Sequence, residues 1–253
     1  MNKNNLTIKK LNLSHLDDVM KLQQTIIDGL HPDEKHFILQ RTVADYQKSL
    51  EGKSSSMIGI FDGDKLIAQT VYMLPQDNEG RDMPEFKPEI KNSELVIFEG
   101  ILVDPNYRGT GLMHKMLQYV EEKALNKDRT HAIIQIAIDN PASWMSALHY
   151  GMNISKVDLD PSDGVKVIYL EKDIVPAYKK PRRIKNKKIY NMYLGDNIHQ
   201  KIPALFLKMQ HLIAHGYKGV GFNKQTRSLV WAKDDSRLKS IQLLHANNAH
   251  IKD

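Results

Sequence analysis

One carboxylate and one glycine loop are the features of this sequence best suited to chemistry. Glu99 stands inside the apolar run FEGIL, where an unpaired carboxylate would be disfavoured unless it faced a polar cleft. A few residues later the run ILV ends at Val103, and a short loop holds Arg108, Gly109 and Gly111 before helical spacing resumes. A strand, an exposed glycine loop and a helix thus follow one another over residues 93–124.

A glycine loop between a strand and a helix is a recurring anion site. The start of a helix presents unpaired N–H groups, and glycine lets the backbone approach a phosphate closely. Arg108 would add a fixed cation, although an ordinary tight turn with a solvated arginine explains the same residues. Two phosphate motifs fail here, because the dinucleotide pattern requires glycine where His114 stands and the P-loop pattern has no match.

Length and composition restrict the class of protein. The chain has 253 residues, of which 41% are hydrophobic, so we expect a buried core. It has no cysteine, which excludes disulfides, thiolate zinc sites and a cysteine nucleophile. We expect no metal. The first 18 residues contain no long apolar stretch, so we expect neither a signal peptide nor a membrane anchor and assign the chain to the cytoplasm.

The positive charge is concentrated in one segment. The formal net charge is +6, and seven basic residues lie between Lys179 and Lys188; +6 less these seven gives −1 for the remainder. Such a run is typical of a solvated linker, and it would also suit nucleic acid or another anionic surface. We favour the linker.

Periodicity predicts a mixed α/β (α+β) chain with a small C-terminal appendage. Ser14 is the expected N-cap of the first helix, and Asp62-Gly63-Asp64 a hairpin turn. The predicted strands are 6–12, 57–61, 65–74, 93–103, 131–139, 154–160 and 165–173, with helices at 15–28, 37–50, 112–124 and 140–150. A β-α-β-β series follows at 188–194, 203–215, 217–222 and 227–232. We therefore expect a first domain at 1–178, a basic linker at 179–188 and an appendage of unknown role at 189–253.

The segment VDPNYRGTGLM resembles the signature [QR]-x-x-G-x-[GA] of the GNAT superfamily of acyl-CoA-dependent N-acyltransferases. Arg108 and Gly111 match its first two fixed positions, whereas Met113 stands where the family usually has Gly or Ala and makes the loop more crowded. A second patch, NPASWMSALHYGM, is similar to the family's helix after the fifth strand, with matches at Asn140, Ser143, Gly151 and Met152. The order of elements agrees over about residues 6–173.

The resemblance implies a mixed, mostly antiparallel sheet whose central parallel strands, 93–103 and 131–139, splay apart to hold acyl-CoA. Backbone N–H groups of the loop and the Arg108 side chain would grip the pyrophosphate. Backbone groups near Leu102 and Val103 would align the pantetheine arm and polarise the thioester carbonyl. The residues that it implies for acetyl-CoA are Leu102, Val103, Arg108, Gly109, Thr110, Gly111, Leu112, Met113, Asn140 and Ser143.

An amine acceptor must lose a proton before it attacks, and Glu99 is our candidate base. Strand alternation would place it with Ile101 and Val103, opposite Phe98 and Leu102; the alternative is a carboxylate paired with a loop or an arginine. Glu94 is a second choice.

Many family members use a tyrosine to protonate the leaving thiolate, but Ala147 occupies that position here. Tyr150 is the candidate that lies nearby, and water, the acceptor or no acid at all are the alternatives.

We therefore expect an N-acetyltransferase that moves acetyl from acetyl-CoA to a primary amine by direct attack through a tetrahedral intermediate. The alternatives are a CoA-binding sensor or scaffold, favoured by Met113 and Ala147, and a nucleic-acid-associated protein that uses the basic run. We expect a small-molecule or peptide amine as partner and no membrane, and the sequence leaves a homodimer open. Loops choose the acceptor, so the recognised residues do not name it.

Overall fold

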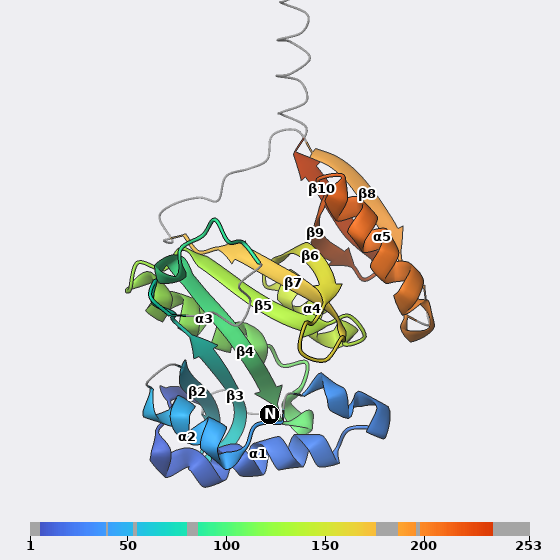
Figure 1. Ribbon diagram of the computed structural model, residues 1–253. Coiled ribbons are helices and arrows are strands. Elements are labelled where there is room, and N and C mark those ends of the chain that lie inside the picture. The colour runs from blue at the N-terminus through green and yellow to red at the C-terminus, as the bar shows by residue number, and fades with distance from the viewer. Residues whose placement is uncertain are drawn as a thin grey trace, which may run out of the picture.

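A computed structural model describes residues 6–38, 40–52, 55–79, 86–175, 187–195 and 198–234. Strands and helices follow one another in the order that the sequence predicts (Figure 1). In chain order they are β1 (Leu6–Lys10), α1 (Leu16–Asp28), α2 (Val43–Glu51), β2 (Ser55–Asp62), β3 (Lys65–Met73), β4 (Leu95–Val103), α3 (Leu112–Leu125), β5 (His131–Ala137), α4 (Pro141–His149), β6 (Asn153–Leu159), β7 (Lys166–Asp173), β8 (Lys187–Tyr193), α5 (Ile202–Ala214), β9 (Lys218–Asn223) and β10 (Ser228–Asp234).

The strands form one ten-stranded sheet in the order β1-β2-β3-β4-β5-β7-β6-β9-β10-β8. β4 and β5 pair in parallel, and the remaining described pairs are antiparallel. The predicted fold class, a mostly antiparallel sheet with central parallel strands, flanking helices and a C-terminal β-α-β-β unit, is confirmed. The parallel pairing runs from Leu95–His131 to Phe98–Ile134 and then ends, although both strands continue.

Helices cover both faces of the sheet (Figure 1). α1 and α2 pack on one face, where Val19 and Tyr46 meet alternate residues of β2 and β3 such as Met57. α3, α4 and α5 share a larger core on the opposite face, which contains Ile58 and Trp144. Met57 and Ile58 are neighbours in one strand and therefore point to opposite faces, so burial of both fixes the register of the sheet.

A β-bulge at Glu99 changes the predicted alternation along β4. Val71 pairs with Gly100 and Tyr72 with Phe98, so Glu99 has no partner of its own in β3. An extra residue inverts the in-and-out pattern that follows it. Our expectation that Ile101 and Val103 lie opposite Phe98 is therefore wrong. They pack in the same core as Phe98, whereas Leu102 packs with α1 and α2.

Both N-terminal helices begin at other residues than the pattern predicts. Asn12, and not Ser14, caps the first turn, a 3₁₀ turn at Leu13–His15 that leads into α1. α2 begins only at Val43, where the Thr42 side chain accepts from the Asp45 N–H in a capping box. α2 is therefore six residues shorter at its N-terminus than predicted, and Arg41 lies in the loop just before the Thr42 cap.

The C-terminal unit continues the sheet at one edge. β9 joins β6 through the pair Ile154–Gly219, and β10 and β8 follow. The Lys218 ammonium also lies 2.5 Å from the Glu171 carboxylate of β7. Most of the basic run, 179–186, lies outside the described residues, and β8 begins with its last two lysines.

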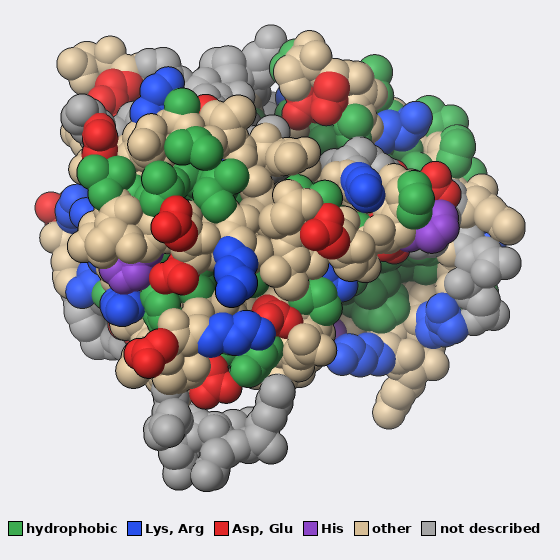
Figure 2. Space-filling view, turned by 90° about the horizontal axis from the view of Figure 1, so that it is seen from below, with side chains coloured by type: hydrophobic (Ala, Val, Ile, Leu, Met, Phe, Trp, Pro, Cys, Tyr) green, Lys and Arg blue, Asp and Glu red, His purple; other side chains and the backbone are tan. Residues whose placement is uncertain are grey.

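The surface at the α1–α2 end carries mixed charge. Figure 2 looks onto this end and shows Lys and Arg side chains interspersed with Asp and Glu. Within the described ranges, every helix is too short or too polar to cross a bilayer. The same residues contain no cluster of three or more His, Cys, Asp or Glu that could hold a metal ion.

Candidate active site

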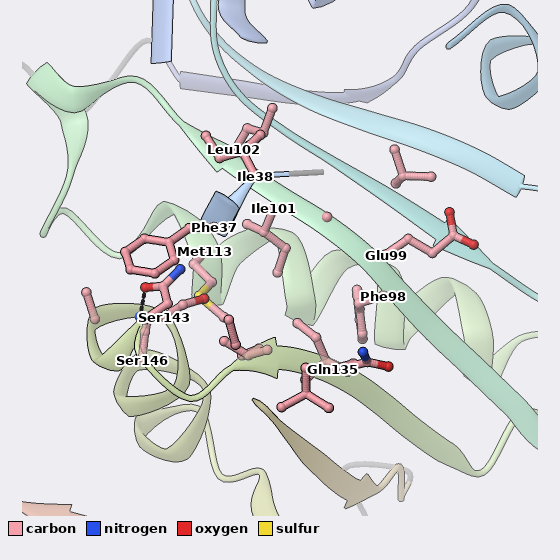
Figure 3. A pocket seen from close by; sticks show the side chains of 18 of the residues that line it. Phe37, Ile38, Phe98, Glu99, Ile101, Leu102, Met113, Gln135, Ser143 and Ser146 are labelled. Atoms are coloured by element: carbon pink, nitrogen blue, oxygen red, sulfur yellow. Dashed lines mark hydrogen bonds between the residues drawn. The ribbon is translucent and has the colours of Figure 1, made fainter. Parts of the chain in front are cut away.

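A cleft of about 1730 Å³ opens where β4 and β5 part. The last residues of β4, Glu99 to Val103, line it on one side, and Gln135 to Ala137 of β5 line it on the other (Figure 3). Because no strand pairs with this edge of β4, its backbone groups face the cleft and can align an extended ligand. The Leu102 and Val103 backbone predicted to hold pantetheine lies in this stretch.

The glycine loop closes one end of the cleft. Gly109 and Gly111 have φ values of +74° and +84°, a conformation that favours glycine, and a Cβ on either would meet no atom within 4 Å. Gly111 caps α3 without a side-chain hydrogen bond, and the first helical N–H to bond its carbonyl belongs to Lys115. The N–H groups of the first turn are therefore left for an anion, with the exposed Arg108 beside them.

The loop is anchored to the β2–β3 hairpin. The buried Asp104 accepts from Lys65 Nζ at 2.7 Å and from the Asn106 N–H at 2.9 Å. Burial disfavours its carboxylate, but these hydrogen bonds outweigh burial and hold its pKa below the ordinary value. The Tyr107 hydroxyl donates to Asp62, and the Thr110 hydroxyl donates to the Tyr107 carbonyl. Thr110 therefore shapes the loop with its side chain and has only its N–H to offer a ligand.

The start of α4 faces the same cleft. Asn140 caps this helix by accepting from the Ser143 N–H at 3.2 Å, and both residues line the cleft. Met113 is half-buried, packs against the core and points into the cleft near Ser143 (Figure 3). His114 Nε2 lies 2.9 Å from the Ser146 carbonyl oxygen, which can only accept, so Nε2 carries the proton. This bond ties α3 to α4 beside the cleft.

Glu99 reaches the cleft from the bulge, on the α1–α2 side of the sheet (Figure 3). Its Oε2 lies 2.7 Å from Arg41 Nη2, and the two side chains are only 13% and 14% exposed. The alternative that we considered for Glu99, a carboxylate paired with an arginine, thus describes its contact. Glu94 is not among the residues that line the cleft.

Buried polar side chains hold Arg41 in place, and sequence reasoning missed all of them. The Gln23 side chain bonds both backbone groups of Arg41, at 3.0 Å to N and 2.9 Å to O. Tyr46 donates to Gln23, and Gln69 donates to Tyr46. Burial raises the pKa of Tyr46 to about 12, so its hydroxyl keeps its proton at neutral pH. A glutamine in an apolar helix stripe was the signal available in the sequence.

Tyr150 is not among the residues that line the cleft. Its ring lies 3.9 Å from Lys172 Nζ, and burial together with the nearby Glu121 carboxylate strongly raises the pKa of its hydroxyl. Ala147, at the family's tyrosine position, is fully buried in the core. The structure therefore brings together Glu99, the glycine loop, Asn140 and Ser143, but not Tyr150.

Comparisons with known proteins identify the fold and the family. The sequence model of the acetyltransferase (GNAT) family matches residues 17–147. A probable acetyltransferase from Staphylococcus epidermidis superposes with a TM-score of 0.53 at 17% identity, covering 67% of this chain and 99% of its own. The ribosomal-protein-S18-alanine N-acetyltransferase of Escherichia coli superposes with a TM-score of 0.50 at 15% identity, covering 70% of this chain and 99% of its own. Arabidopsis thaliana NAA60 in complex with acetyl-CoA superposes with a TM-score of 0.52 at 11% identity, covering 67% of this chain and 98% of its own.

These identities establish the fold alone, and a comparison with curated protein sequences finds no match. The neighbours are covered almost completely, while about a third of this chain has no counterpart in them. The family match spans more than half of the chain and includes the glycine loop and most of α4. The protein belongs to the GNAT acetyltransferase family.

Proposed function

We propose that this protein is an acetyl-CoA-dependent N-acetyltransferase that acts on a primary amine. The observation that carries the proposal is the open glycine loop at the end of the cleft between the parted parallel strands. A Cβ at Gly109 or Gly111 would project into open space, which suits a cradle for a bulky anion such as the pyrophosphate of acetyl-CoA. Among the named neighbours, the Arabidopsis thaliana NAA60 structure is a complex with acetyl-CoA.

Each group in the cleft has a task under this proposal. The N–H groups from Gly109 to Met113 and the Arg108 guanidinium bind the pyrophosphate. The free edge of β4 near Leu102 and Val103 holds the pantetheine arm, and Asn140 and Ser143 close the cleft over it. An N–H of this edge stabilises the negative charge that develops on the thioester oxygen.

Glu99 receives the proton of the attacking amine, directly or through water. The amine nitrogen then forms a bond to the acetyl carbon and releases a second proton to solvent, and the tetrahedral intermediate collapses with loss of the CoA thiolate. We assign no proton donor to the thiolate, because Ala147 is buried and Tyr150 lies outside the cleft lining.

A thermal-shift titration tests the donor site. Acetyl-CoA at about 100 times its Kd should raise Tm by about 5 °C or more. Arg108→Glu should abolish this shift, because it places a carboxylate beside the phosphates. Lys127→Glu changes the net charge equally at the opposite end of α3 and should leave the shift intact. No shift in the wild-type protein would overturn the proposal.

Thiol release separates an enzyme from a sensor that binds the same molecule. A sensor is the second candidate because Met113 narrows the cleft and no tyrosine stands at the position of Ala147. Free CoA that appears only when an amine is present supports transfer. A thermal shift without thiol release for any amine would favour the sensor.

A further inference from the structure

We propose that the acceptor is a small zwitterion whose amine and carboxylate lie within a few bonds of each other, as in a free amino acid. Arg41 would bind the carboxylate, and Glu99 would bind the amine. This inference rests on the proposed function and names the class of amine.

The ion pair between these residues lies in the cleft wall. Arg41 Nη2 and Glu99 Oε2 are 2.7 Å apart, and both side chains line the cavity while being about one-seventh exposed. Charges withdrawn from water to this extent lose much hydration, and a buried pair often adds little to stability. A ligand that carries both charges can reach the ion pair from the cleft. Ligand recognition therefore accounts for a buried ion pair that adds little to stability.

Buried hydrogen bonds to its backbone hold Arg41 in place beside the cleft. The Gln23 amide bonds both its N and its O, and the Tyr46 hydroxyl holds Gln23 in turn. Gln23 and Tyr46 are 2% and 1% exposed, so the hydrogen bonds that hold Arg41 are shielded from water. A guanidinium has five N–H donors in a plane that matches a carboxylate. Within the described residues it contacts Glu99 through Nη2 alone, and the other nitrogens can serve a ligand.

The short distance between the two charges sets the size of the ligand. An ammonium on Glu99 and a carboxylate on Arg41 must lie close together in one molecule. A polyamine would bring a second cation toward Arg41, and a peptide N-terminus has an uncharged amide where an amino acid has its carboxylate. Both would leave the guanidinium without its second partner, and the site therefore discriminates against them.

Binding of the carboxylate would also assist the chemistry. An opposite charge beside a carboxylate makes it a weaker base. A ligand carboxylate that draws Arg41 away leaves Glu99 more basic at the moment when an ammonium must be deprotonated. An amine without the carboxylate leaves Arg41 on Glu99, and its deprotonation is slower.

Matched substrates test this inference without any variant. A panel of free amino acids, their carboxamides and the corresponding decarboxylated amines is assayed with acetyl-CoA by thiol release. For the amino acid that reacts best, kcat/KM should exceed that of its amide and amine by about 10- to 100-fold. An amide or amine that reacts equally well overturns the inference while the proposed function stands. Failure of every amine overturns both.

Variants then assign the preference to Arg41. Arg41→Gln should bring the ratio of kcat/KM for amino acid over amide close to one, and Arg41→Lys should give an intermediate ratio. Lys48→Gln removes the same charge from another residue that lines the cleft and should keep the wild-type ratio. The acetyl-CoA thermal shift of each variant shows that the donor site is intact. A wild-type ratio in Arg41→Gln would overturn the assignment.

Discussion

At the scale of single residues, the surroundings of Glu99 depend on one extra residue in β4. Its carboxylate lies on the α1–α2 side of the sheet, where it contacts Arg41, and opposite the face of Phe98. A regular strand would carry Ile101 and Val103 on the same side as Glu99. The bulge instead buries both in the α3 core and leaves the carboxylate in the cleft.

We expect Glu99→Gln to lower kcat by about 100-fold or more, because the amide cannot accept the proton of the amine. The acetyl-CoA thermal shift should be unchanged, since Glu99 lies on the acceptor side of the cleft. Glu94→Gln is the matched control, because Glu94 belongs to the 3₁₀ turn before β4 and does not line the cleft. Turnover that survives in Glu99→Gln would remove Glu99 from the mechanism.

At the scale of elements, the glycine loop is set by its neighbours as much as by its own sequence. Asp104 caps the 3₁₀ turn Pro105–Tyr107 and reaches across to Lys65 in β3, while Tyr107 reaches Asp62 in β2. The β2–β3 hairpin thus holds the loop in the shape that bares the first turn of α3. A ligand at this loop meets a preformed site and does not have to order it.

The Asp104 anchor predicts a pH dependence of stability. Its pKa is lowered in the folded protein, so its contribution is complete above the unfolded pKa, about 4, and is lost as the pH falls through the folded value. At pH 7, Asp104→Asn should lower the free energy of unfolding by about 1 kcal/mol, since Lys65 is largely exposed and screened. Urea unfolding from pH 7 to pH 3 measures the difference.

The difference between wild type and Asp104→Asn should shrink as the pH drops below about 4. A difference that stays constant to pH 3 would contradict the role of the ionised carboxylate. Asp173→Asn removes another strand-end carboxylate, 82% exposed, and should have little effect at either pH.

At the scale of the whole molecule, the C-terminal unit shares the core of α3 and α4 but joins the sheet through very little strand pairing. β9 meets β6 at a single residue pair, where an added Cβ at Gly219 would lie 3.0 Å from Ile154 Cβ. Glycine therefore permits the close approach that makes the two parts one sheet. Lys224, in the β9–β10 turn, also lines the cleft, so the unit contributes to its wall.

Gly219→Val should separate β9 from β6, because Ile154 Cβ is fixed to its backbone and cannot move aside. We expect a loss of about 1–3 kcal/mol in the free energy of unfolding and faster amide hydrogen exchange in β9. Gly221→Val, in the same strand, meets open space and should be nearly neutral. Equal effects of the two substitutions would show that the junction does not depend on this close approach.

The sequence by itself determined the order of elements and the glycine loop that closes one end of the cleft. These features are local: periodicity reports which face is buried, and positive φ angles at Gly109 and Gly111 follow from a turn that other residues rarely adopt. The helix face that carries Leu112 and Met116 was predictable for the same reason, and both residues are buried.

The tertiary structure alone decided what surrounds Glu99. The bulge at Glu99 is a shift in the register between β3 and β4. The sequence of β4 by itself does not determine how β3 pairs with it. Arg41 is 58 residues away from Glu99 along the chain, and Gln23, Tyr46 and Gln69 come from α1, α2 and β3. Contacts between distant segments form only when the chain folds, so local patterns do not encode them.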